Sequence, residues 1–188
     1  MKRINLSTII LAIFVTFSAT AQTSGKLVST KTHIKFFSTT PAENIEANNN
    51  TAVGTINKET GEVVFSVPMQ GFEFEKALMQ KHFNSDNFLD TQKFPKAKII
   101  GKITNLDKVN FVKDGTYDAN VQGDMTIKGV TKPITEKGTV TVKGNTVEVH
   151  SKFNLTLADY GISFVKGKPS TNIAKSVEVT LHSELQAQ

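Results

Sequence analysis

The sequence predicts an all-β fold, a single antiparallel eight-stranded barrel with a short helical insertion capping one end. Three features lead to this prediction. Apolar and polar residues alternate along most of the chain, which is typical of strands with one buried face. Short turn signals separate the alternating segments, which favours antiparallel neighbours. About eight such segments are present, and closing them into a barrel removes the exposed edges of the sheet. A sandwich with a solid core is the alternative.

Apolar residues two positions apart identify the strands in chain order. Ile34 and Phe36 mark the first strand. The clearest alternation covers residues 118–128, where every second residue is apolar or glycine. The remaining inward-facing sets are Val63, Phe65, Val67 and Met69; Ile134, Val140 and Val142; Val147, Val149, Phe153, Leu155 and Leu157; and Val177, Val179, Leu181 and Leu185.

The segments between the strands have turn, loop and helix compositions. Gly144-Asn145 predicts a tight hairpin turn, because both residues tolerate positive φ. Thr60-Gly61 and Asp114-Gly115 also predict turns. Residues 42–51, with three consecutive asparagines, are expected to form a polar loop. Residues 74–88 have no β-branched residue and are the helical candidate.

The first 21 residues have the features of a secretory signal peptide. Lys2 and Arg3 precede an apolar run, and Ala19-Thr20-Ala21 has the small-x-small pattern of a cleavage site. We therefore expect cleavage after Ala21, an exported product, and one domain over residues 22–188. An uncleaved membrane anchor is the alternative, but the apolar run is short for a membrane span. No stable membrane insertion is expected.

Composition argues against several functional classes. Without Lys2 and Arg3, the 22 basic residues fall to 20 against 17 acidic residues, a net charge of +3 instead of +5. These charges are scattered, which does not favour nucleic-acid binding. The absence of cysteine excludes disulfides, thiolate metal sites and a cysteine nucleophile. No nucleophile-elbow or dinucleotide-binding motif is present. No cofactor is expected.

The stretch from Met79 to Pro95 contains a candidate polar site. His82, Asp86 and Asp90 would share one face of a regular helix, where they could bind a divalent metal or perform acid–base chemistry. However, residues 84–87 (Asn-Ser-Asp-Asn) have a strong turn composition and would interrupt that helix. We expect Ser85 or Asp86 to cap the next turn and Asp90 to be solvated. The sequence thus predicts no catalytic residue and no metal site.

Phenylalanine and methionine form an unusual apolar set around this stretch. The chain has 13 phenylalanines and no tryptophan. Several lie outside the centres of the expected strands: Phe72, Phe74, Phe83, Phe88 and Phe94, with Met69 and Met79 nearby. Such side chains suit a pocket for a long hydrocarbon. They could equally plug one end of the barrel as ordinary core.

Three segments together resemble the YceI-like family. Residues 123–134 (GDMTIKGVTKPI) are similar to its strand-turn-strand signature, and residues 82–97 (HFNSDNFLDTQKFPKA) are similar to its other signature. Asp159-Tyr160-Gly161-Ile162 resembles a third conserved element. Gln80-Lys81 and Leu157-Ala158 stand where the family often has charged residues, so the resemblance leaves the ligand head group open. Physically, residues 129–133 are most simply a turn that sets strand register.

The resemblance implies a periplasmic, lipocalin-like barrel that carries an isoprenoid, such as a polyprenyl or quinone-like compound, or another long-chain amphiphilic lipid, without catalysis. A short amphipathic helix would cap the barrel, with His82 at the pocket mouth. The residues expected to line or close the tunnel are Phe36, Phe65, Val67, Met69, Phe72, Phe74, Met79, His82, Phe83, Phe88, Met125, Ile127, Phe153 and Leu155.

Two other functions and a dimer remain compatible with the sequence. A filled barrel could act as an interaction module for another envelope protein. A hydrolase or isomerase could act on a lipid-like substrate around His82, Asp86 and Asp90. A barrel of this size could also form a homodimer, which nothing in the sequence decides.

Overall fold

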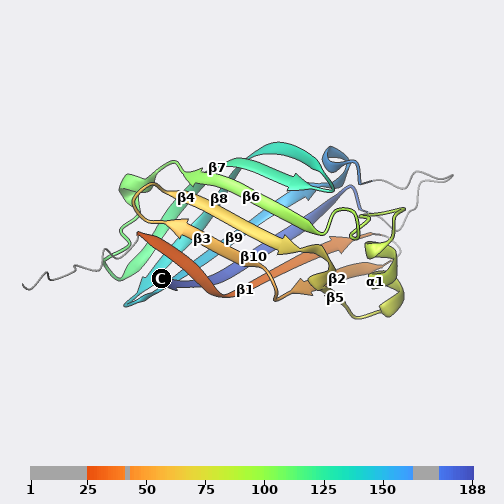
Figure 1. Ribbon diagram of the computed structural model, residues 1–188, viewed down its shortest axis with the longest axis horizontal. Coiled ribbons are helices and arrows are strands. Elements are labelled where there is room, and N and C mark those ends of the chain that lie inside the picture. The colour runs from red at the N-terminus through yellow and green to blue at the C-terminus, as the bar shows by residue number, and fades with distance from the viewer. Residues whose placement is uncertain (1–24, 41–42, 163–173) are drawn as a thin grey trace, which may run out of the picture.

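The structure is a computed structural model that describes residues 25–40, 43–162 and 174–188. Figure 1 shows an elongated barrel with helix α1 (Ala77–Asn84) at one end. The expected signal peptide lies outside the described residues. The strands are β1 (Lys26–Thr39), β2 (Asn44–Asn49), β3 (Val53–Asn57), β4 (Glu62–Pro68), β5 (Phe72–Phe74), β6 (Lys96–Ile103), β7 (Gly115–Ile127), β8 (Val130–Lys143), β9 (Thr146–Thr156) and β10 (Ser176–Ala187). Short 3-10 helices are η1 (Met69–Gly71), η2 (Leu106–Lys108) and η3 (Leu157–Tyr160).

The first and last strands close the sheet into a barrel. β1 pairs with β10 in antiparallel register from Leu27, opposite Ala187, to Phe37, opposite Glu178. The other neighbours follow the order β10, β9, β8, β7, β6, β4, β3, β1. In the described part of the chain, these eight strands form a closed antiparallel barrel. Closure confirms the predicted fold, because a sandwich would leave two sheets facing each other.

β1 is long enough to serve two neighbours on its other edge. Its first residues, Lys26 to Val28, pair with β3, whereas Ile34 to Thr39 pair with β2. β2 in turn pairs with β5, which leads towards α1. The barrel wall is thereby extended by two short strands at the end that carries the helix (Figure 1).

The predicted alternation matches the burial of the strands. In β4, Val63, Phe65 and Val67 are buried, and the neighbouring residues are more exposed. Ala119, Met125 and Ile127 are buried on β7. Of the eight barrel strands, β3 and β6 were not foreseen. β3 is short, and β6 carries Ile100 on its outer face with 53% of its surface exposed, which breaks the apolar-inside pattern.

The prediction of a polar loop over residues 42–51 was wrong, because residues 44–49 form β2. Asn49 is fully buried, and its polar groups are satisfied. Its side-chain amide donates to the carbonyl of Pro68 (2.8 Å), and its Oδ1 accepts from the Thr51 backbone N–H (2.8 Å). A buried asparagine with its hydrogen bonds made is compatible with a strand. Composition alone could not reveal these partners.

The helix is shorter than the predicted span of residues 74–88. The first residue of this span, Phe74, belongs to β5, which pairs with β2, and the helix begins only at Ala77. The helix ends at Asn84, as the turn composition suggested. Ser85 begins the following turn, since its carbonyl accepts from the backbone N–H of Phe88 (3.0 Å) and of Asp90 (2.8 Å). Its hydroxyl donates to the carbonyl of His82 (2.7 Å), and it therefore caps the carboxyl end of α1.

The turn between β7 and β8 contains Lys128 and Gly129, both with positive φ (49° and 77°). This confirms a turn at Gly129, since paired positive φ values favour a tight hairpin, but residues 130–133 already belong to β8. Pro133 lies in β8, before the ladder with β9 begins at Gly138. The edge of β8 that faces β9 is therefore unpaired at Pro133, and the missing backbone N–H of the proline costs no ladder hydrogen bond.

Gly129→Ala is expected to destabilise the fold more than Gly144→Ala. Both glycines have positive φ, which costs an alanine about 1 kcal/mol. A Cβ at Gly129 would also lie 2.8 Å from the Phe94 ring, whereas nothing lies within 4 Å of one at Gly144. Urea unfolding of the two variants should therefore separate them by about 1 kcal/mol or more. Equal losses would contradict the close contact with Phe94.

Candidate functional site

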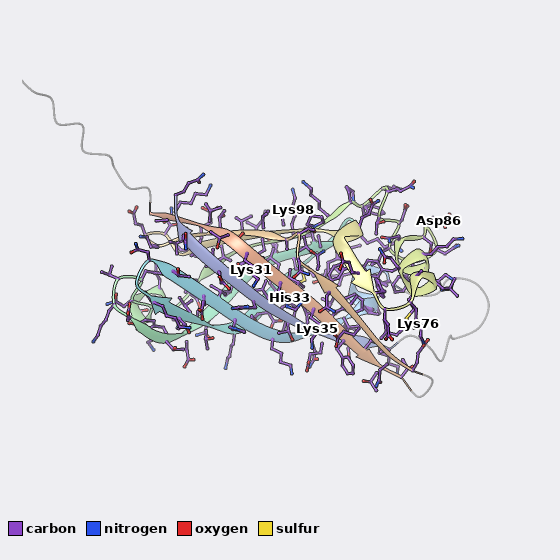
Figure 2. The ribbon with its side chains drawn as sticks, turned by 90° about the horizontal axis from the view of Figure 1, so that it is seen from below. Lys31, His33, Lys35, Lys76, Asp86 and Lys98 are labelled. Atoms are coloured by element: carbon purple, nitrogen blue, oxygen red, sulfur yellow. The ribbon has the colours of Figure 1, made fainter. Side chains whose placement is uncertain are left out.

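A cavity of about 140 Å³ lies inside the barrel near the end that carries α1. All of its lining residues are apolar except Lys98 of β6, which is largely exposed to solvent (Figure 2). The lining residues are Ile34, Phe36, Val67, Met69, Phe72, Phe83, Phe88, Leu89, Ala97, Lys98, Ile99, Met125, Ile127, Phe153, Leu155, Leu157, Ile162, Val177, Val179 and Leu181. Such a lumen can hold a hydrocarbon but offers it almost no hydrogen bonds.

A second cavity of about 70 Å³ lies deeper in the barrel. Ile99, Phe153 and Leu181 line both cavities, so the two cavities are adjacent at these side chains. The lining of the second cavity is more polar and includes Glu136, Thr139 and Ser151. The barrel interior therefore remains mostly apolar further along the strands, with a few polar side chains among the residues that line it.

Most of the residues predicted to form the tunnel are brought together. Those lining the larger cavity are Phe36, Val67, Met69, Phe72, Phe83, Phe88, Met125, Ile127, Phe153 and Leu155. Phe65 lines the smaller one. Phe74 and Met79 are half-buried and line neither cavity. His82 is exposed on α1 and also lines neither cavity, so its place at a pocket mouth gains no support.

Phe83 is the centre of an aromatic cluster that closes the α1 end of the lumen. Its ring centroid lies 5.0 Å from that of Phe74, 5.5 Å from Phe72, 5.8 Å from Phe36 and 6.3 Å from Phe88. Phe83 is buried, whereas Leu78 on the same helix has 63% of its surface exposed. The helix is thus attached to the barrel chiefly through one ring.

Hydrogen bonds hold the segment after α1 against the helix. The hydroxyl of the fully buried Thr91 donates to Oδ1 of Asn84 (2.9 Å). The Asn84 side-chain amide donates to the carbonyl of Gln80 (3.0 Å). This bridge brings the chain around so that Phe88 and Leu89 line the cavity. The asparagine in this turn therefore positions the apolar cap.

His82, Asp86 and Asp90 do not form a site. His82 and Asp86 are exposed, with Asp86 beyond the end of α1 (Figure 2). Asp90 has φ of 47° in the following turn, and its carbonyl accepts from the backbone N–H of Lys93 and Phe94. In the part of the chain that the structure describes, no group of three or more His, Cys, Asp or Glu residues is arranged to hold a metal ion.

The other three histidines lie side by side on the outer face of the barrel. His33 of β1 pairs with His182 of β10, which pairs with His150 of β9. The His150 and His182 rings stack with centroids 4.2 Å apart. Nε2 of His33 lies 2.9 Å from Oδ1 of Asn48, and Figure 2 shows His33 on β1 between Lys31 and Lys35. Desolvation and then the nearby His182 lower the pKa of His150.

The lowered pKa of His150 predicts a loss of stability in mild acid. As the pH falls, His150 of the unfolded chain is protonated near pH 6.5, whereas His150 of the folded protein is protonated only at lower pH. The free energy of unfolding therefore decreases as the pH falls through and below 6.5. We expect His150→Gln to flatten the wild-type decrease in chemical-denaturation midpoint over this range. An unchanged pH slope in this variant would show that the stacked pair does not contribute.

Several lining residues were missed by sequence reasoning. Leu89 lies in a turn and carried no strand signal. Ala97 and Ile99 alternate with lysines in β6, a weak signal that could have found them. For residues 159–162 the sequence indicates a resemblance to a family element but no place in the cavity wall. Tyr160 and Ile162 are buried around Gly161, which adopts φ of 64°, and Ile162 reaches the larger cavity.

The described residues include no helix that is both long and apolar enough to cross a membrane.

A UPF0312 protein from Shewanella denitrificans is 29% identical over 119 residues, covering 60% of this chain and 59% of that protein. A second, from Pseudomonas putida, is 30% identical over 112 residues, covering 56% and 53%. The chain thus spans little more than half the length of these relatives.

Two solved structures share the fold at low sequence identity. A polyisoprenoid binding domain from Saccharophagus degradans, implicated in plant cell wall breakdown, superposes with a TM-score of 0.73 at 13% identity, covering 87% of this chain and 99% of that one. BcnA from Burkholderia cenocepacia gives 0.65 at 17% identity, covering 81% and 95%. The family model of the YceI-like domain matches residues 16–185. The chain therefore belongs to the YceI-like domain family.

Proposed function

We propose that this protein is a periplasmic carrier that holds an isoprenoid or another long-chain amphiphilic lipid in the barrel lumen. The observation that carries the proposal is the apolar cavity inside the closed barrel. Burying a hydrocarbon contributes about 0.8 kcal/mol per CH₂, so a chain can bind without strong polar contacts. The polyisoprenoid binding domain with the same fold supports this choice of ligand class. The signal-like residues 1–21 support export.

The volume of the lumen sets a condition on the ligand. A cavity of about 150 Å³ in another protein accommodates benzene, and the larger cavity here measures about 140 Å³. A long chain must therefore displace side chains as it enters. Met69 and Met125 are suited to this, because methionine has flexible torsions and adapts to irregular shapes. The proposal thus requires the lumen to widen on binding.

The two cavities of the barrel interior also bear on the alternatives. A filled barrel that acts only as an interaction module has no need for two adjoining cavities. A lipid-acting enzyme around His82, Asp86 and Asp90 would need these side chains to converge on one site. Their separate, largely exposed positions give that alternative no support.

Competition binding tests the carrier proposal. The chain has no tryptophan, so a fluorescent prenyl probe can be followed with little background. Unlabelled prenols of increasing length should displace the probe at one saturable site, each added isoprene unit strengthening binding until the lumen is filled. Absence of saturable binding by any prenol or fatty alcohol would contradict the proposal and favour the interaction module.

A further inference from the structure

Glu136 lies on the inner face of the barrel wall. In the β7–β8 ladder it is directly opposite Val121, and Ala119 and Met125 are buried on the same face of β7. Residues opposite each other in an antiparallel pair point to the same side of the sheet. Glu136 accordingly lines the smaller cavity. An acidic side chain on this wall is unexpected for a barrel that serves only hydrocarbon.

The carboxyl group lies where two strands separate. β8 and β9 are paired only between Gly138, opposite Ser151, and Lys143, opposite Thr146. Glu136 is two residues beyond the end of this ladder. The Ser151 hydroxyl donates to the carbonyl of Lys137 (2.7 Å) and satisfies the first acceptor past the ladder. η3 packs against β8, beside this opening. The inner wall is therefore locally interrupted next to Glu136.

No basic side chain of the described residues forms an ion pair with Glu136. Lys137 also contributes to the smaller cavity, but it alternates with Glu136 along β8 and is exposed. Lys132 shares the inner face yet lies four residues away, roughly 13 Å along the strand. Desolvation raises the pKa of Glu136. Burial, followed by the charges of Asp159 and then Glu136, raises the pKa of the Tyr160 phenol. The Glu136 carboxylate is thus partly desolvated, and no described residue compensates its charge through an ion pair.

We propose that Glu136 binds the head group of the ligand, and that this head group is uncharged and carries a hydroxyl. The proposal rests on the carrier function above. In this arrangement the larger cavity takes the hydrocarbon chain and the smaller one, which adjoins it at Ile99, Phe153 and Leu181, takes the head group. A carboxylate accepts a hydrogen bond from an alcohol or phenol. It repels a phosphate, because like charges at short range in a partly desolvated site are unfavourable.

Geranylgeraniol and geranylgeranyl phosphate test this head-group selectivity, since they differ only at the head group. Isothermal titration calorimetry at neutral pH should show that the wild-type protein binds the alcohol about tenfold or more tightly than the phosphate. Glu136→Gln removes the charge at nearly constant shape, so its phosphate affinity should rise and the preference should shrink to about threefold or less. Glu148→Gln, the same charge change outside the lumen, should retain the wild-type preference.

The outcomes separate this inference from the carrier proposal. If both compounds bind the wild type with equal affinity, or if Glu136→Gln leaves their ratio unchanged, the head-group assignment is wrong and the carrier proposal stands. If neither compound nor any longer prenol binds, both are wrong. Circular dichroism confirms that each variant is folded before the affinities are compared.

Discussion

Phe153→Asp is expected to lower the affinity for a prenyl ligand by about a hundredfold or more, the largest effect on binding that we predict. Phe153 lines both cavities and lies where they meet. A carboxylate there must either remain ionised beside hydrocarbon or attract water into the lumen. Both results remove the apolar surroundings that favour the chain. The fluorescent-probe competition assay measures the loss.

Two controls distinguish lumen chemistry from general damage. Asn154→Asp adds the same charge at the next residue of β9, which is exposed, and should bind as the wild type does. His82→Ala changes an exposed residue outside both cavities and should also have little effect. If His82→Ala alone abolished binding while folded Phe153→Asp retained it, the apolar-lumen account would have to be replaced.

Phe83→Ala is expected to cost about 3–5 kcal/mol of folding stability, the largest effect on the fold that we predict. Phe83 is buried at the centre of four ring contacts and attaches α1 to the barrel. Removing its ring leaves a void among the neighbouring phenylalanines and takes away part of the lumen wall. Urea unfolding measures the stability, and ligand release should be faster because the cap is loosened.

Leu78→Ala on the same helix provides the matched control. Leu78 is largely exposed, so its truncation should change stability by less than about 0.5 kcal/mol. Similar losses for Leu78→Ala and Phe83→Ala would show that α1 is not held by the Phe83 ring. Faster release without a stability loss in Phe83→Ala would assign the ring to the cap alone.

The regular strands could be predicted from sequence because their apolar residues face one interior. Val63, Phe65 and Val67 show this plainly, and with the turn at Gly144 they were enough to suggest antiparallel neighbours. Closure through β1 and β10 was inferred from the need to protect edges. Most tunnel residues followed from the same alternation, because the inner face of a barrel is also the wall of its cavity.

The remaining features depend on contacts between distant residues. Asn49 looks like a loop residue until Pro68 and Thr51 satisfy its side chain. Ile100 faces outwards and hides the pattern of β6. Glu136 becomes notable only when the β7–β8 register places it opposite Val121 and the β8–β9 ladder ends beside it. No local pattern encodes these long-range relationships.

Native mass spectrometry of the protein purified from its own cells tests the central claim most directly. Organic extraction and lipid identification should follow on the same sample. The carrier account predicts one long-chain, prenyl-type or similar amphiphile per barrel, lost in folded Phe153→Asp and retained in Asn154→Asp. A ligand-free mass that stays unchanged after incubation with polyprenols and quinones would contradict it.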